Sequence, residues 1–164
     1  MELLIVRHGP AVERGTPGYE DDDRRPLTEE GEKKFRKAAR GLARLLPKPD
    51  VLLTSPLPRA HRTAEIAAEA WGGAGLAVAP PLAGGSLKEV AGLIAAHRTA
   101  PLVALFGHEP DVSELLAHLL GTSQADRLAF KKGGAALVEL DGGLEAGGRL
   151  VWFLPPRVLR ELGD

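Results

Sequence analysis

The chain has 164 residues, the size of one domain and enough to bury an apolar core. Its 21 Lys and Arg residues are matched by 22 Asp and Glu residues, and this balance argues against a dedicated nucleic-acid-binding protein. The absence of cysteine excludes disulfides, thiolate nucleophiles and cysteine-based metal sites. We therefore expect a single domain over residues 1–164, with no nucleic-acid partner.

No apolar run approaches the ~20 residues that a membrane-spanning helix needs. The first residues, 1–8, form a short apolar strand that meets charge, unlike a secretory signal peptide. We therefore expect a cytoplasmic protein without membrane association. The chain has no Asn, one Gln and one Met, and this depletion of labile residues predicts a thermophilic source.

Short apolar runs alternate with longer stretches of helical periodicity, a pattern typical of α/β proteins. Strands are expected at residues 3–6, 51–54, 76–78, 102–106, 135–140 and 149–154, the last two as a hairpin. A helix is expected to begin after a Thr28 cap and to end near Leu46, before two prolines. Further helices are expected over residues 58–71, 87–97, 111–120 and 155–162.

Charged and imidazole side chains follow three of the predicted strands. Arg7 and His8 follow the first strand, Arg59 lies just beyond the second, and His108 follows the fourth. Because ligands of open α/β sheets bind at the carboxyl ends of the strands, we expect these four side chains to converge.

This set of side chains suits a phosphoryl group. Arginine offers a planar fork of donors that clamps phosphate in bidentate fashion. An imidazole with an unprotonated nitrogen is a competent nucleophile when its other nitrogen is held as a donor, and a second histidine can stabilise transition-state charge. We expect Gly9 to let the backbone turn sharply and approach the anion closely. The pattern indicates phosphoryl transfer through His8.

These residues carry a family resemblance. Arg7-His8-Gly9, the segment from Ser55 to Thr63 (Ser-Pro-Leu-Pro-Arg-Ala-His-Arg-Thr) and Gly107-His108 resemble the histidine phosphatase superfamily, whose fold is phosphoglycerate-mutase-like. Residues 25–31, Arg-Pro-Leu-Thr-Glu-Glu-Gly, resemble the SixA-type phosphohistidine phosphatases within it. The resemblance covers nearly the whole chain. It implies a three-layer α/β/α domain with a mostly parallel central sheet, and no metal or other cofactor.

The resemblance also implies the roles of individual residues. His8 is the implied phosphorylated nucleophile, and Arg7, Arg59 and His108 complete the phosphate pocket. Arg25 is implied as a further contact at the mouth of that pocket. The implied function is a metal-independent phosphatase that forms a phosphohistidine intermediate. Its expected partner is a phosphohistidine-bearing protein, and nothing in the sequence demands more than a monomer.

One departure from the family pattern bears on the substrate. Larger members place a Glu general acid after the third strand, whereas residues 81–87 here contain no carboxylate. An imidazole leaves phosphorus more readily than an alkoxide does, so the gap favours an N-phosphoryl substrate. Glu89 lies further on and is expected on a helix, while Glu109 and the Asp21–Asp23 run remain candidate acids.

Three other functions stay open from the sequence. A small-molecule phosphomonoesterase would use the same residues, and a non-catalytic phosphate- or phosphopeptide-binding module would use the same scaffold. In a metallohydrolase His8 and His108 would be ligands, but Arg7 and Arg59 would repel the cation.

Some residues also have competing interpretations. Arg62 lies three residues after Arg59 on the same helical face, so either could reach the site. Arg25 could simply pair with the Asp21–Asp23 run. The remaining histidines, at positions 61, 97 and 118, are interpreted as structural or solvated.

Overall fold

The computed structural model describes residues 1–164, which form one six-stranded sheet with the order β3-β2-β4-β1-β5-β6. Strands β1 (Glu2–Arg7), β2 (Val51–Thr54), β3 (Leu76–Val78) and β4 (Leu102–Gly107) are parallel, and β5 (Ala135–Glu139) and β6 (Arg149–Leu154) form the antiparallel hairpin. The sheet is therefore mostly parallel, and its two central strands are β4 and β1, which directly precede His108 and His8.

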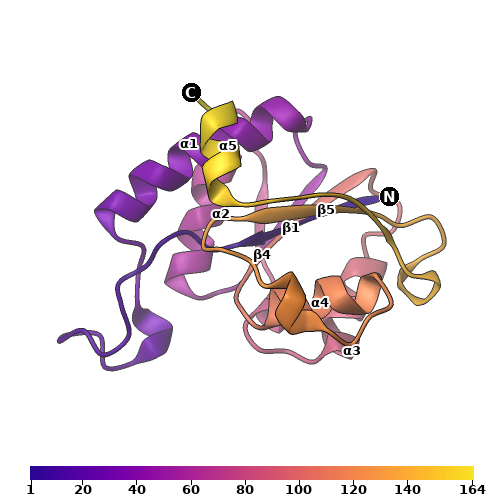
Figure 1. Cartoon of the computed structure of the whole chain (residues 1–164), viewed down its shortest axis with the longest axis horizontal. Coiled ribbons are helices and arrows are strands. Elements are labelled where there is room, and N and C mark those ends of the chain that lie inside the picture. Colours follow the sequence, from indigo (N-terminus) through magenta and orange to yellow (C-terminus); the bar gives the residue numbers. More distant parts are fainter.

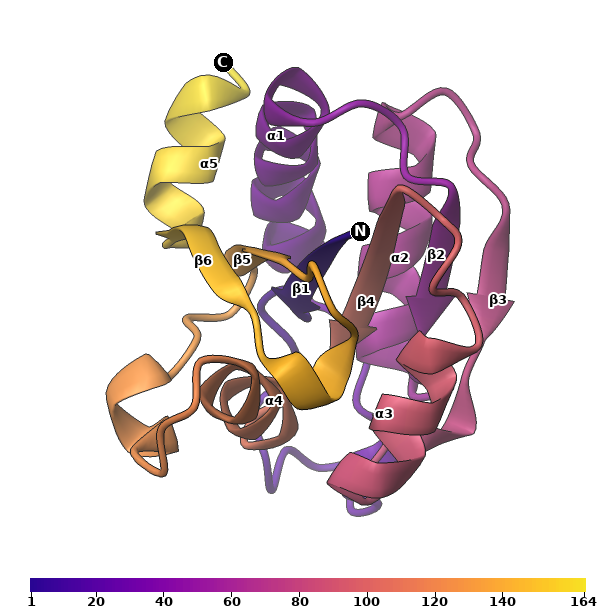
Figure 2. The ribbon, with the colours of Figure 1, turned by 90° about the vertical axis from the view of Figure 1, so that its right-hand side faces the viewer.

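Helices cover both faces of the sheet (Figure 1). One face carries α1 (Glu29–Leu45), α2 (Pro58–Ala70) and α5 (Pro156–Leu162), and the other carries α3 (Leu87–Ala95) and α4 (Asp111–Leu119), as Figure 2 shows from the side. The expected three-layer α/β/α fold is confirmed.

The burial of β1 accounts for its uninterrupted run of apolar residues. Leu4 and Val6 enter the core on the side of α1, α2 and α5, while Leu3 and Ile5 enter the core on the side of α3 and α4. All four side chains are fully buried. Successive side chains of a strand point to opposite faces, so a strand covered on both sides needs apolar residues at every position.

Side-chain caps fix where two of the helices begin. Thr28 Oγ1 accepts a hydrogen bond from the Gly31 N–H at 2.9 Å and starts α1. Ser86 and Glu89 form a reciprocal capping box at the start of α3. Each cap satisfies backbone donors that a helix cannot bond internally, which is why the two starts were predictable.

Two features differ from the sequence prediction. Helix α3 ends at Ala95 rather than residue 97, because the chain there changes to the tighter i→i+3 hydrogen bonds, such as His97 N to Ile94 O at 3.0 Å. Four short 3₁₀ helices were not predicted from the hydrophobic pattern: η1 (Asp22–Arg24), η2 (Pro80–Leu82), η3 (Ala125–Leu128) and η4 (Leu144–Ala146). None of the helices is both long and apolar enough to cross a bilayer.

Candidate active site

Sheet register brings the two histidines together. Arg7 at the end of β1 pairs with Gly107 at the end of β4, so His8 and His108 each follow the last paired residue of adjacent strands. The His8 N–H donates to the Gly107 carbonyl at 3.0 Å, and Ser55 follows β2 on the other side of β4. The parallel sheet thus gathers residues about 100 positions apart at one edge.

His8 is buried and held in one tautomer. Its Nδ1 lies 2.7 Å from the Gly9 carbonyl oxygen, which can only accept, so Nδ1 carries the proton and Nε2 keeps its lone pair. Burial, assisted by His108, Arg59 and Arg7, lowers the pKa of His8 to about 3 despite that hydrogen bond. The ring is therefore neutral at pH 7, as a nucleophile must be.

His108 faces His8 with the ring centroids 5.3 Å apart. Its Nε2 lies 2.7 Å from the Ser55 hydroxyl, while its Nδ1 is buried without a partner. Burial lowers the pKa of His108 to about 4, assisted by Arg59 and Arg7. A neutral ring whose Nε2 accepts from Ser55 presents Nδ1–H as a donor to a bound oxygen.

Arg7 and Arg59 are each held through a terminal guanidinium nitrogen, whereas their Nε atoms have no hydrogen-bond partner. Arg7 Nη1 donates to the Phe130 carbonyl at 2.6 Å, and Arg59 Nη1 donates to the Asp22 carbonyl at 2.9 Å. Arg7 Nε, Arg59 Nε and His108 Nδ1 are the only buried side-chain nitrogen or oxygen atoms in the chain without a partner. Each such group costs about 1–3 kcal/mol. Three of them from the residues around His8 indicate a site built to receive an anion.

Arg25 is buried, and two of its guanidinium nitrogens donate to protein atoms. Its Nε donates to Asp22 Oδ1 at 2.7 Å and its Nη1 to the Val12 carbonyl, so the pairing with the acidic run that the sequence left open is present. Asp22 Oδ2 also lies 3.4 Å from Arg59 Nη2. Arg25 is thus joined to the pocket through Asp22, and no hydrogen bond links it to His8.

Gly9 differs from the expectation of a sharp turn. Its φ is not positive, and its N–H donates to the Thr63 hydroxyl at 3.0 Å instead of being free for an anion. A Cβ at this position would make ordinary contacts, 3.4 Å from Phe35 and 3.5 Å from Leu27. Gly9 therefore serves the site through the carbonyl that holds His8.

The two arginines of α2 have separate surroundings. Arg59 is buried at the site, whereas Arg62 pairs with Glu32 at 3.0 Å and with Glu65 at 3.1 Å, between α1 and α2. The competition between them is thus resolved in favour of Arg59 as the pocket residue. His118 is exposed on α4, as expected.

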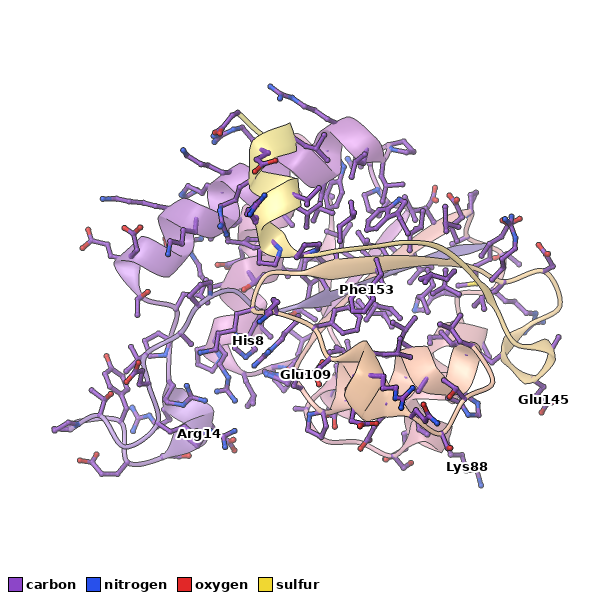
Figure 3. All side chains as sticks on the ribbon, in the orientation of Figure 1. His8, Arg14, Lys88, Glu109, Glu145 and Phe153 are labelled. Atoms are coloured by element: carbon purple, nitrogen blue, oxygen red, sulfur yellow. The ribbon has the colours of Figure 1, made fainter.

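Sequence reasoning missed the residues that hold the site together. Glu109 accepts hydrogen bonds from the Phe130 N–H at 3.0 Å and from the Ser113 hydroxyl at 2.7 Å, and the Phe130 carbonyl in turn holds Arg7. Figure 3 shows His8 and Glu109 at the end of the sheet, with Arg14 on the loop that projects beyond. A backbone carbonyl has no signature in the sequence, so the Phe130 contact could not be foreseen.

Three carboxylates, those of Glu89, Glu109 and Asp22, are engaged by other protein groups. Glu89 caps α3 and is exposed, and both oxygens of Glu109 accept hydrogen bonds. A hydrogen bond from Arg25 lowers the pKa of Asp22, which is therefore ionised at pH 7. No group of three or more His, Asp or Glu side chains is arranged to hold a metal ion.

Comparison with known proteins identifies the family. The family model of the histidine phosphatase superfamily (branch 1) matches residues 3–92. An uncharacterised protein of Picosynechococcus sp. is 37% identical over 137 residues, which are 82% of each chain.

Two solved structures are similar along nearly the whole chain. The protein histidine phosphatase SixA complexed with tungstate is 27% identical with a TM-score of 0.82, covering 97% of this chain and 99% of its own. A structure from Agrobacterium tumefaciens assigned as the phosphohistidine phosphatase SixA is 25% identical with a TM-score of 0.78, covering 94% and 97%. The chain belongs to the histidine phosphatase superfamily, branch 1, as a phosphatase with a SixA-type structure.

Proposed function

We propose that this protein is a protein phosphohistidine phosphatase that works through a phosphorylated His8. The observation that carries the proposal is a neutral imidazole with three neighbouring residues, Arg7, Arg59 and His108, that each hold a buried nitrogen without a partner. Such donors suit the oxygens of a phosphoryl group, and the free lone pair of His8 Nε2 suits attack on its phosphorus.

In the first step His8 Nε2 attacks phosphorus in line while the bond from phosphorus to the substrate nitrogen breaks. The electron pair stays on the leaving imidazole, which departs neutral when its other nitrogen carries a proton. Arg7 and Arg59 hold the phosphoryl oxygens, and His108 Nδ1 donates to the charge that develops on them.

In the second step water attacks phosphorus and the bond to Nε2 breaks. The electron pair returns to Nε2, and the proton of the water goes to the departing phosphate. Because Nδ1 keeps its proton through the bond to the Gly9 carbonyl, His8 leaves as a neutral imidazole rather than an anion. This lowers the barrier to hydrolysis of the intermediate and returns the starting tautomer.

The choice of an N-phosphoryl substrate rests on the carboxylates. An alkyl phosphate ester needs an acid to protonate its leaving oxygen, and Glu89, Glu109 and Asp22 are all held by hydrogen bonds or ion pairs. An imidazole leaving group needs no such acid. The named activity of the SixA structures at 25 and 27% identity points to the same substrate class.

The test is to trap the intermediate and to rank substrates. The wild type is mixed with a ³²P-labelled phosphohistidine peptide and quenched, and an acid-labile, base-stable label on His8 is expected. His8→Ala should lose both label and turnover, while a chelator should change neither in the wild type. Label on another residue, or faster turnover of simple alkyl phosphates than of the peptide, would contradict the proposal.

A further inference from the structure

Asp22 is the one carboxylate that contacts the arginines of the pocket. Its oxygens lie 2.7 Å from Arg25 Nε, 3.1 Å from Arg14 Nε and 3.4 Å from Arg59 Nη2, and its backbone carbonyl accepts from Arg59 at 2.9 Å. One acidic side chain from η1 thus joins three arginines that come from three different segments. The described mechanism gives it no role.

Asp22 lies at the solvent side of the pocket. Its side chain is 42% exposed, whereas those of Arg59 and Arg25 are 5% and 8% exposed. His8 and His108 are also buried. A leaving group that extends toward solvent from a phosphoryl group held by Arg59 therefore comes near this carboxylate when it leaves on the side of η1.

The charge of the site is small before a phosphoryl group binds. The four guanidinium groups of Arg7, Arg14, Arg25 and Arg59 are opposed by the three carboxylates that act on them, those of Asp22, Asp23 and Glu109. One positive charge is left, because both histidines are neutral at pH 7. A dianionic phosphoryl group exceeds it. A second anionic group on the substrate then finds no net attraction and meets the Asp22 carboxylate at the solvent side of the pocket.

We infer that Asp22 is a specificity-determining residue that disfavours substrates with a second negative charge near the phosphoryl group. The preferred leaving groups are neutral or cationic, as is the imidazole of a phosphohistidine without acidic neighbours. The part of the inference that concerns phosphohistidine rests on the proposed function. A substrate carboxylate about 8 Å from Asp22 is repelled at the effective dielectric constant of a protein surface. We expect this repulsion to lower kcat/KM for the anionic substrate approximately 5- to 30-fold.

The test uses two esters that differ only by one carboxylate, phenyl phosphate and 4-carboxyphenyl phosphate. The wild type is expected to favour phenyl phosphate about 5- to 30-fold in kcat/KM at low ionic strength, and salt should reduce the ratio. Asp22→Asn keeps the shape and the hydrogen-bond acceptor but removes the charge, so its ratio should fall close to that set by the esters alone. If Asp22→Asn acted only by loosening Arg59, the rates with both esters would fall and their ratio would stay unchanged.

Asp21→Asn is the matched control. Asp21 caps η1 by accepting from the Asp23 N–H at 3.0 Å, a bond that asparagine can also make, and Asp21 makes no contact with the arginines. Its ratio should equal that of the wild type. A wild type that prefers the carboxylated ester, or equal ratios in the wild type and Asp22→Asn, would overturn the inference.

The outcome separates this inference from the proposed function. If phosphohistidine peptides are not hydrolysed but the ester ratio depends on Asp22, the proposed substrate is wrong and the charge selection stands. If the peptides are hydrolysed and the ratio is insensitive to Asp22, only the charge selection fails. Peptides with alanine or glutamate beside the phosphohistidine should repeat the ester result in the wild type.

Discussion

Arg59 offers the sharpest test of the anion site, because a substitution by lysine keeps its charge and removes its geometry. The side chain is 5% exposed, both terminal nitrogens are turned to Asp22, and Nε is buried without a partner. An ammonium group has no counterpart to Nε–H and cannot hold Asp22 and an oxyanion in two fixed directions at once.

The expected loss follows from one charge-assisted hydrogen bond. Such a bond contributes about 1.5–3 kcal/mol. At about 1.4 kcal/mol for each factor of ten, Arg59→Lys should bind an oxyanion roughly 10- to 150-fold more weakly than the wild type. The measurement is the dissociation constant of tungstate by titration calorimetry, with the melting temperature checked for each protein.

Arg62→Lys provides the control on the same helix. Arg62 pairs with Glu32 and Glu65 and is 32% exposed, so its substitution should leave tungstate affinity within error of the wild type. The reasoning is refuted if Arg59→Lys binds tungstate as tightly as the wild type. It is refuted equally if Arg62→Lys loses as much affinity as Arg59→Lys.

Two further predictions concern stability. Burial lowers the pKa of His8 to about 3 and of His108 to about 4, so between these values and the ordinary 6.5 the unfolded chain binds more protons than the folded one. The free energy of unfolding, from urea titrations between pH 7 and 5, should fall by about 1.4 kcal/mol per pH unit for each histidine once the pH is well below 6.5, and a flat profile would contradict this. Gly41→Ala places a Cβ 2.0 Å from the Leu159 carbonyl oxygen where α1 meets α5, so a loss of about 1–3 kcal/mol is expected despite the better helix propensity. In the Gly92→Ala control in α3 the added Cβ meets open space, so stability should rise by up to about 1 kcal/mol. Similar stability of the two variants would contradict the prediction, because α5 would then have moved to make room for the Cβ.

The fold was predictable because its signals are local. The apolar run of β1 reflects burial on two faces, and the Thr28 cap fixes the start of α1 through its own hydroxyl. Even the meeting of His8 and His108 follows from the rule that parallel strands end at one edge of a sheet. Their assignment as catalytic residues stays a prediction until the trapping experiment is done.

The architecture and the set of residues at the carboxyl end of the sheet follow from local sequence patterns, since hydrophobic periodicity, caps and strand ends depend on neighbouring side chains. How those residues are held depends on long-range packing. Arg59 rather than Arg62 enters the pocket because Glu32 and Glu65 engage the latter, and the Phe130 carbonyl fixes Arg7. Contacts of this kind join distant segments and use backbone atoms or shared charges, so their partners exist only once the chain has packed.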